Sequence, residues 1–281
     1  MTAKLMDGKA AAQEVVDALK KEVSSFTKKP GLALILVGDD PASKIYTASK
    51  EKRCAEIGIR SEMNRLPEKT SQRELISLIE KLNKDNSIHG IIVQLPLPKH
   101  LDPAEAAAKI SQDKDVDGIS PANMGRLLRG EDCLVPCTPQ GIMYLLKKYG
   151  VEINGKRASI VGRSNIVGKP VSVLLLNEHA TVTICHSRTA DLCAETKKAD
   201  ILVAAVGKAR MIKADMVKKG AAVIDVGMNR TADGLAGDVD FDSVSKIAGW
   251  ITPVPGGVGL MTVAMLMKNT VEAYKRLEGL K

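Results

Sequence analysis

Residues 158–168 read ASIVGRSNIVG, an apolar run that passes directly into a loop with a glycine at each end. The pattern predicts a strand over 158–161 and a helix over 169–178, so the loop from Gly162 to Gly168 joins a strand to a helix. Dinucleotide pyrophosphates bind at such junctions, because the free N–H groups and the dipole of the helix attract anions. The motif G-x-G-x-x-G is incomplete, since Ser164 replaces the second glycine, and a tight turn without a ligand is the alternative.

The segment after the next predicted strand, 181–185, bears on the choice of dinucleotide. An NAD site usually has an acidic residue there, about 20 residues after the glycine loop, which binds the ribose 2′-hydroxyl. Here the segment contains Ser187 and Arg188 and no acid. A guanidinium can bind a 2′-phosphate through two hydrogen bonds, and Arg163 in the glycine loop can join it. The sequence therefore predicts NADP rather than NAD.

The alternation of strands and helices extends in both directions from this loop. Toward the N-terminus, predicted strands at 32–37, 59–66 and 88–93 alternate with helices at 7–25, 42–57 and 71–85. Toward the C-terminus, a helix at 140–149 precedes strands at 158–161, 181–185, 201–205, 222–226 and 250–252, and a helix at 262–277 follows. The series predicts an α/β fold with two αβ domains, in which helices cover parallel sheets and the final helix packs back on the first domain.

The composition limits the classes of protein to consider. The chain is 44% hydrophobic and 26% charged, as is typical of globular proteins, and no stretch approaches the roughly 18 apolar residues of a membrane span. The first 24 residues contain four acids and no apolar core, so we expect neither a transit nor a signal peptide and a cytoplasmic protein without membrane contact. The five cysteines are irregularly spaced, and we expect neither a disulfide framework nor a metal site.

The formal net charge of +8 favours anionic ligands such as phosphates and polycarboxylates. The basic residues are spread along the chain, and aromatic residues, which stack on bases in many nucleic-acid-binding proteins, make up only 2%. The sequence therefore favours a small polyanionic ligand over a nucleic acid.

A candidate catalytic pattern lies in the predicted helix 42–57. Ser43, Tyr46 and Lys50 recur at i, i+3 and i+7 and therefore share a face. The Tyr46/Lys50 spacing is similar to the Tyr/Lys pair of short-chain dehydrogenases, but in those enzymes the glycine loop precedes the pair, whereas here it follows. From spacing alone, a solvated helix with a half-buried tyrosine is the simpler interpretation.

Further motifs change that interpretation. Residues 94–98 read QLPLP after a buried strand, and residues 113–118 read DKDVDG after the next helix. Together with the glycine loop and the segment 253–259, PVPGGVG, these motifs resemble the bifunctional methylenetetrahydrofolate dehydrogenase/methenyltetrahydrofolate cyclohydrolase family. The resemblance runs from Gly38 to the final helix. It implies NADP-dependent oxidation of 5,10-methylenetetrahydrofolate, followed by hydrolysis of the methenyl product to 10-formyltetrahydrofolate.

The resemblance also implies roles for individual residues. Lys50 is similar to the catalytic lysine of the family, Tyr46 to its companion aromatic residue, and Gln94 to the amide that positions the lysine. Asp117 is similar to the carboxylate that binds the pterin, and Ser43 is a further candidate for substrate binding. The candidate cofactor-binding residues are Gly162, Arg163, Ser164, Ser187, Arg188 and Gly257.

The family implies a domain division and a setting. We expect a catalytic, folate-binding αβα domain of residues 1–139 and 262–281, and a Rossmann-type NADP-binding domain of residues 140–261. We also expect a homodimer and a role in one-carbon metabolism and purine biosynthesis. One departure is Leu260, which stands where the family commonly has proline, so that a backbone N–H and freedom in φ are restored.

Three other functions remain as alternatives. A shikimate-dehydrogenase-like NADP reductase would share the two-domain plan and a catalytic lysine, but the motifs around Gln94 and Asp117 argue against it. A folate- or nucleotide-binding protein without catalysis is disfavoured by the complete set of Lys50, Tyr46 and Gln94. A basic nucleic-acid-binding protein would bind DNA or RNA with a steep dependence on salt.

Overall fold

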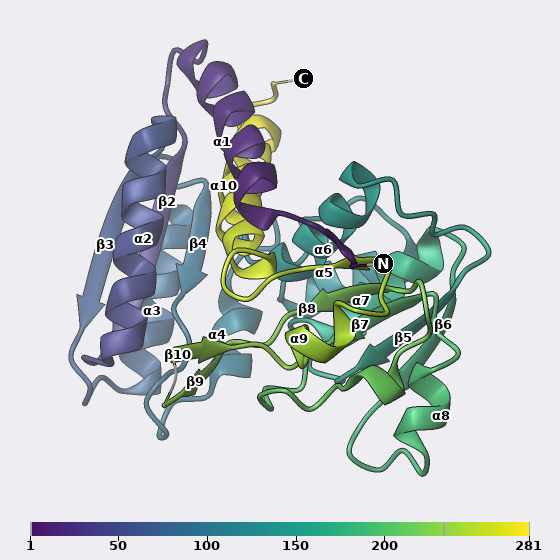
Figure 1. Cartoon of the computed structure of the whole chain (residues 1–281). Helices are drawn as coiled ribbons and strands as arrows, with labels where there is room; N and C mark the ends of the chain where they lie inside the picture. Colours follow the sequence, from purple (N-terminus) through teal and green to yellow (C-terminus); the bar gives the residue numbers. More distant parts are fainter. Residues whose placement is uncertain (1, 233, 281) are drawn as a thin grey trace. The chain divides into compact units, whose positions relative to one another are not determined.

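The computed structural model describes residues 2–232 and 234–280, which form two compact units (Figure 1). The six-stranded unit contains the chain up to Gln13 together with Thr138–Thr262. The three-stranded unit contains Glu14–Cys137 and the chain from Val263 onward. Each unit is therefore built from two separate parts of the sequence. Among the described residues, no helix is long and apolar enough to cross a membrane.

The three-stranded unit has the strand order β3 (Arg60–Leu66), β2 (Gly31–Val37), β4 (Gly90–Val93), with both neighbours parallel to β2. Leu34 of β2 is in register with Met63 on one side and Ile92 on the other. Every residue of β2 is buried, because the apolar run occupies the centre of a sheet that is covered on both faces. The helices of this unit are α2 (Pro41–Ile57), α3 (Gln72–Lys84), α4 (Pro103–Lys109) and α5 (Pro121–Arg129), with most of α1 (Gly8–Ser24) and of α10 (Val258–Leu277).

Helix α2 begins and ends where local sequence chemistry predicts. The Asp40 carboxylate accepts a hydrogen bond from the backbone N–H of Ser43 at 2.7 Å, and Pro41 occupies the first turn. Gly58 ends the helix in the left-handed region with φ of 93°, which costs a glycine little. The helix therefore begins at the carboxyl end of β2, where parallel αβ proteins bind their ligands.

The six-stranded unit has a wholly parallel main sheet in the order β1-β11-β8-β7-β5-β6. Its strands are β1 (Lys4–Leu5), β5 (Arg157–Val161), β6 (Thr181–Cys185), β7 (Ile201–Ala204), β8 (Ala222–Asp225) and β11 (Trp250–Ile251). Around it lie α6 (Cys137–Lys148), α7 (Gly168–Asn177), α8 (Leu192–Thr196), the 3-10 turn η1 (Ala214–Met216), α9 (Phe241–Val244) and the hairpin β9 (Asn229–Thr231) and β10 (Gly234–Ala236). Because β6 and β7 lie on opposite sides of β5, the chain reverses its winding there, which makes the carboxyl ends of β5 and β7 a topological switch point.

The predicted α/β fold class with two αβ units is confirmed, and several details differ. The chain up to Gln13, expected with residues 14–139, lies in the six-stranded unit, because β1 pairs with β11. Helix α10 begins at Val258 rather than 262. Helix α5 and the β9–β10 hairpin were not predicted. Strands of two or three residues are too short to produce a periodic pattern.

Candidate active site

The Lys50 side chain is held by Gln94. Its ammonium donates a hydrogen bond to the Gln94 Oε1 atom at 2.8 Å, while the Gln94 amide nitrogen donates to the carbonyl of Leu95 at 2.6 Å. The backbone of Gln94 continues β4 by donating to the carbonyl of Ile35 at 2.8 Å. The side-chain oxygen of Gln94 therefore faces Lys50, since its amide group is already committed.

Lys50 and Asp117 influence each other electrostatically. Burial lowers the pKa of the Lys50 ammonium below 10.5, and the nearby Asp117 carboxylate counteracts this in part. Burial raises the pKa of Asp117 above 3.8, and the charge on Lys50 counteracts that change. The side chains of Lys50 and Asp117 are surrounded by many protein atoms, and each is still partly exposed to solvent. The structure therefore brings together Lys50, Gln94 and Asp117, three of the predicted site residues.

The turn that carries Asp117 is shaped by a different aspartate. The buried carboxylate of Asp115 accepts hydrogen bonds from the backbone N–H of Gly118 at 3.1 Å and of Ser120 at 2.8 Å, and from the Asn123 amide at 2.9 Å. Gly118 has φ of 70°, and a Cβ atom there would lie 2.6 Å from the backbone nitrogen of Pro136. Asp115 thus accepts the hydrogen bonds of the backbone N–H groups in this turn. The Asp117 carboxylate is left to interact with Lys50 and the Cys137 thiol.

Ser43 and Tyr46 lie on the same helix as Lys50 but differ in exposure. The side chain of Ser43 is buried, and its hydroxyl has no hydrogen-bond partner among the described residues. The Tyr46 side chain is 40% exposed, which suits an aromatic residue that contacts a ligand ring. A buried hydroxyl without a partner is unfavourable in a protein interior, and of these two side chains only Tyr46 is open to a ligand in this structure.

Two further residues that hold the Asp117 segment were not singled out from the sequence. The Asn269 amide of α10 donates to the carbonyls of Val116 at 2.9 Å and Val135 at 2.8 Å. The Cys137 thiol donates to the Val116 carbonyl at 3.2 Å. Asn269 and its neighbour Thr270 are buried polar residues in a mostly apolar helix, and polar residues in such a setting were the available signal.

At both of its glycines, the loop after β5 has no room for a side chain. Gly162 has φ of 124°, and a Cβ atom there would lie 2.2 Å from the carbonyl oxygen of Ala205, which follows β7. A Cβ atom on Gly168 would lie 2.2 Å from the Gly162 oxygen. The Ser164 hydroxyl accepts from the backbone N–H of Val167 at 3.2 Å and of Gly168 at 3.3 Å. The strand, loop and helix are therefore packed as closely as a dinucleotide-binding junction requires.

The other predicted cofactor-binding residues also follow the carboxyl ends of strands in this sheet, and all but one of them lie beside the glycine loop. Arg163 follows β5, and Ser187 and Arg188 follow the neighbouring β6, all three with exposed side chains. The Arg188 backbone N–H donates to His186 Nδ1 at 3.1 Å, which fixes this turn. Two guanidinium groups and a hydroxyl beside a helix start fit a phosphorylated dinucleotide. Gly257 follows β11, which β8 and β7 separate from β5.

Leu260, the departure from the family pattern, lies in the first turn of α10 and is 39% exposed. Backbone N–H groups in a first turn have no partner within the helix, so the N–H that leucine restores leaves the helical hydrogen bonds unchanged.

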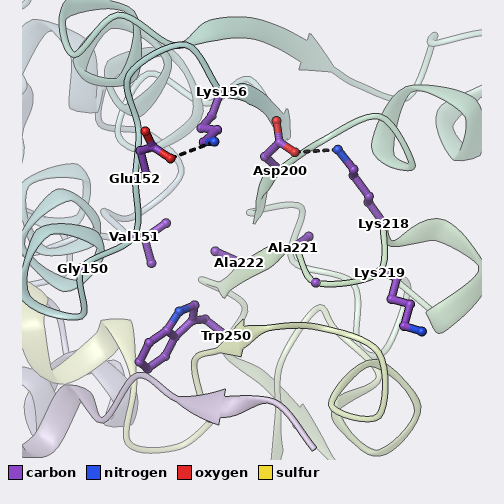
Figure 2. Close-up of a pocket in the computed structure, with 11 residues that line it drawn as sticks. Gly150, Val151, Glu152, Lys156, Asp200, Lys218, Lys219, Ala221, Ala222 and Trp250 are labelled. Atoms are coloured by element: carbon purple, nitrogen blue, oxygen red, sulfur yellow. Dashed lines mark hydrogen bonds and ion pairs between the residues drawn. The ribbon is translucent and has the colours of Figure 1, made fainter. Parts of the chain in front are cut away.

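A cavity of about 260 Å³ lies elsewhere, at the opposite edge of the six-stranded sheet (Figure 2). Its lining includes the first residues of two strands, Ala222 and Trp250, and two ion pairs, Lys156–Glu152 at 2.8 Å and Lys218–Asp200 at 2.6 Å. None of the predicted site residues lines it. Parallel sheets bind ligands at the carboxyl ends of their strands, and this cavity lies at the amino ends.

Two models of one protein family together match nearly the whole chain. The family model for the tetrahydrofolate dehydrogenase/cyclohydrolase catalytic domain matches residues 6–117, and the model for the NAD(P)-binding domain of the same family matches residues 136–278. The bifunctional protein FolD of Moorella thermoacetica is 59% identical over 280 residues, which cover 98% of this chain and 100% of the relative.

The chain is also similar to solved structures of this family. The bifunctional enzyme FolD from Campylobacter jejuni has a TM-score of 0.96 at 48% identity and covers 98% of this chain and 99% of its own. The FolD structure from Trypanosoma brucei, described as complexed with NADP cofactor and inhibitor, has a TM-score of 0.94 at 41% identity, with 98% of both chains covered. A shikimate dehydrogenase from Aquifex aeolicus, at 15% identity and a TM-score of 0.52 over 89% of this chain and 93% of its own, shares only the fold. This chain therefore belongs to the tetrahydrofolate dehydrogenase/cyclohydrolase family.

Proposed function

We propose that this chain is a bifunctional enzyme that oxidises 5,10-methylenetetrahydrofolate with NADP and then hydrolyses the methenyl product to 10-formyltetrahydrofolate. The observation that carries the proposal is the group of Lys50, Gln94 and Asp117, in which a partly buried lysine with a lowered pKa adjoins a carboxylate. Relatives with this family's name are described as bifunctional, and one structure among them as complexed with NADP.

In this proposal the three-stranded unit binds the folate. A pterin presents an amino group and a ring N–H side by side, and the Asp117 carboxylate can accept both. Tyr46, which is 40% exposed, packs beside the folate ring, and Ser43, one turn before it on the same helix, stays a further candidate for substrate binding. Asp115 and Asn269 act on the substrate only through the backbone around Asp117.

Lys50 serves the hydrolytic step. Water adds to the methenyl carbon, a C–N bond of the ring opens, and one proton is released as the formyl group forms. A lysine whose pKa is lowered has a larger neutral fraction and can accept the proton of the attacking water. The Gln94 side chain is an uncharged acceptor, so it can orient the Lys50 nitrogen in both the ammonium and the amine form and leaves it free to gain and lose a proton.

The six-stranded unit binds NADP, which accepts the hydride of the methylene group when bound. Gly162 and Gly168 allow the backbone to approach the pyrophosphate at the start of α7. The Ser164 hydroxyl holds the glycine loop by accepting a backbone hydrogen bond. Gly257 has no side chain, so the cofactor can approach the backbone closely after β11. Arg163, Ser187 and Arg188 contact the 2′-phosphate. We further propose that the enzyme works as a cytoplasmic homodimer whose formyl product supplies purine biosynthesis, as the family resemblance implies.

The activity is tested by mixing the protein with methylenetetrahydrofolate and NADP while NADPH, methenyl and formyl products are recorded over time. We expect NADPH and the formyl product to rise together. NADPH with methenyl product that disappears only at its spontaneous rate would mean a dehydrogenase alone. No turnover with this substrate, together with shikimate-dependent NADPH formation, would favour the alternative reductase.

Cofactor preference gives a separate prediction. We expect kcat/KM for NADP to exceed that for NAD, and Arg188→Ala to reduce it about tenfold or more for NADP while NAD is little affected, because a charge-assisted phosphate contact is lost. Arg157→Ala is the matched control, since it removes an exposed arginine from the other end of β5. A preference for NAD in the unaltered chain would contradict the prediction.

A further inference from the structure

Two buried carboxylates at the carboxyl edge of the six-stranded sheet have no part in the proposed reaction. Asp225 is the last residue of β8 and is 4% exposed. Asp238 follows the β9–β10 hairpin and is fully buried. Burial raises the pKa of Asp225 to about 6, and the charge on Asp238 adds to the effect. Burying two adjacent carboxylates costs folding free energy. Proteins keep such unfavourable arrangements mainly at functional sites.

The carboxylate of Asp238 organises the loop that follows β7. Its Oδ2 atom accepts from the backbone N–H of Val206 at 2.6 Å and of Gly207 at 2.9 Å. Its Oδ1 atom accepts from the backbone N–H of Lys208 at 2.9 Å and from the Asn229 amide at 2.9 Å. Three consecutive N–H groups thus converge on a single carboxylate, which fixes the conformation of residues 206–208.

Asp225 in turn holds the backbone of Asp238. Its Oδ1 atom accepts from the N–H of Gly227 at 2.9 Å and of Asp238 at 2.8 Å, and its Oδ2 atom from Val239 at 2.9 Å. Glycines make room for both acids, since a Cβ atom on Gly237 would lie 1.8 Å from Asp225 Oδ2 and one on Gly227 would lie 2.4 Å from Asp238 Oδ1. The end of β8 is therefore linked through Asp238 to the loop after β7.

That loop adjoins the glycine loop at the switch point. The carbonyl oxygen of Ala205, the residue before Val206, lies 2.2 Å from the position that a Cβ atom on Gly162 would take. The Ala205 backbone also donates to the carbonyl of Val161, the last residue of β5, at 2.8 Å. Ligands of open parallel sheets bind in the crevice between the loops on the two sides of a switch point. The loop that Asp238 fixes is one of these two.

We propose that Asp238, itself held by Asp225, is a positioning residue for NADP, because it fixes the loop after β7 that faces the glycine loop. This inference rests on the proposed function for the identity of the cofactor. Asp238→Asn replaces one carboxylate oxygen with a donor, which must then face backbone or amide N–H groups that previously had an acceptor. We therefore expect the variant to fold with a displaced loop and an impaired cofactor site.

The test compares Asp238→Asn with Asp242→Asn, an exposed aspartate in α9 of the same unit that gives the same change in charge. NADP affinity is measured by titration, KM is measured separately for NADP and for the folate, and hydrolysis of methenyltetrahydrofolate is measured without NADP. We expect Asp238→Asn to weaken NADP binding about 10- to 100-fold, the equivalent of the loss of one or two buried hydrogen bonds. Folate KM and the NADP-independent hydrolysis should stay within about twofold of the unaltered chain in both variants.

Asn229→Ala provides a milder perturbation if Asp238→Asn does not fold, because it removes one side-chain donor to Asp238 and leaves the backbone donors in place. We expect it to weaken NADP binding by a smaller factor with hydrolysis unchanged. Undiminished NADP affinity in both folded variants would overturn the inference, as would an equal loss of NADP binding and hydrolysis. If the unaltered chain binds NAD and not NADP, the proposed cofactor is wrong, and the same comparison made with NAD decides the role of Asp238.

Discussion

Lys50→Met should abolish hydrolysis of methenyltetrahydrofolate and leave the binding of NADP and folate largely intact. The substitution keeps most of the length and volume of the side chain but removes the nitrogen, which lies 2.8 Å from Gln94 Oε1. Proton transfer by a positioned side chain contributes about 10²- to 10⁴-fold to a rate, and we expect a loss in that range. The measurement is the decay of the methenyl product above its spontaneous rate.

Lys52→Met is the matched control for this variant. Lys52 lies on the same helix with an exposed side chain, so its removal changes the charge of the chain by the same amount without altering the site. Hydrolysis retained by Lys50→Met at the level of the control would remove Lys50 from the mechanism. Folate and NADP binding are measured in both variants to separate a loss of catalysis from a loss of substrate.

Asp117→Asn should raise the KM for the folate substrate about 10- to 100-fold, because an amide can accept from only one of two adjacent pterin donors while its own N–H group opposes the other. The carboxylate also keeps the pKa of Lys50 from falling further. We therefore expect the limb of the hydrolysis pH profile that reports neutral Lys50 to move to lower pH. Asp113→Asn, in the same segment and partly exposed, is the control and should change neither quantity. An unchanged folate KM in Asp117→Asn would contradict the assignment.

Lys50→Met and Asp117→Asn should each be at least as thermally stable as the unaltered chain at pH 7, as measured by thermal unfolding. A lysine whose pKa is lowered on folding destabilises the folded state while it is charged, and this cost disappears as the pH rises toward 10.5. An aspartate whose pKa is raised on folding favours the folded state at low pH, and this contribution is lost as the pH rises through its folded pKa. At pH 7 each substitution therefore removes a group that burial penalises. Such a cost is common where a site is organised for chemistry.

Sequence patterns predicted the long elements well, because their signals are local. The apolar run of β2, the Asp40 cap of α2 and Gly58 at its end each lie within a few residues of the structure they determine. The loop from Gly162 to Gly168 was predicted as a strand–helix junction for the same reason, because it lies directly between β5 and α7. The two-residue β1 has no such signal, because its position depends on pairing with β11, almost 250 residues away in sequence.

The residues that support the site were harder to predict. In the segment DKDVDG, three aspartates alternate with other residues, and only the family resemblance separated Asp117 from Asp115. The structure shows that Asp115 binds the backbone of its own turn, which no pattern of residue types reveals. Asp238 escaped notice for a similar reason, since most of its partners are backbone N–H groups that carry no sequence signal.

The division of each unit between distant parts of the chain has a consequence for biosynthesis. The strands of the three-stranded sheet are translated early. The side-chain amide that donates hydrogen bonds to the carbonyls of Val116 and Val135 belongs to Asn269 in the last helix. Domains generally fold as units once their residues have left the ribosome. Here the ribosome must finish almost the entire chain before the segment that carries Asp117 can be locked in place. A nascent chain arrested after residue 262 would contain every strand of both sheets and still lack a finished folate site.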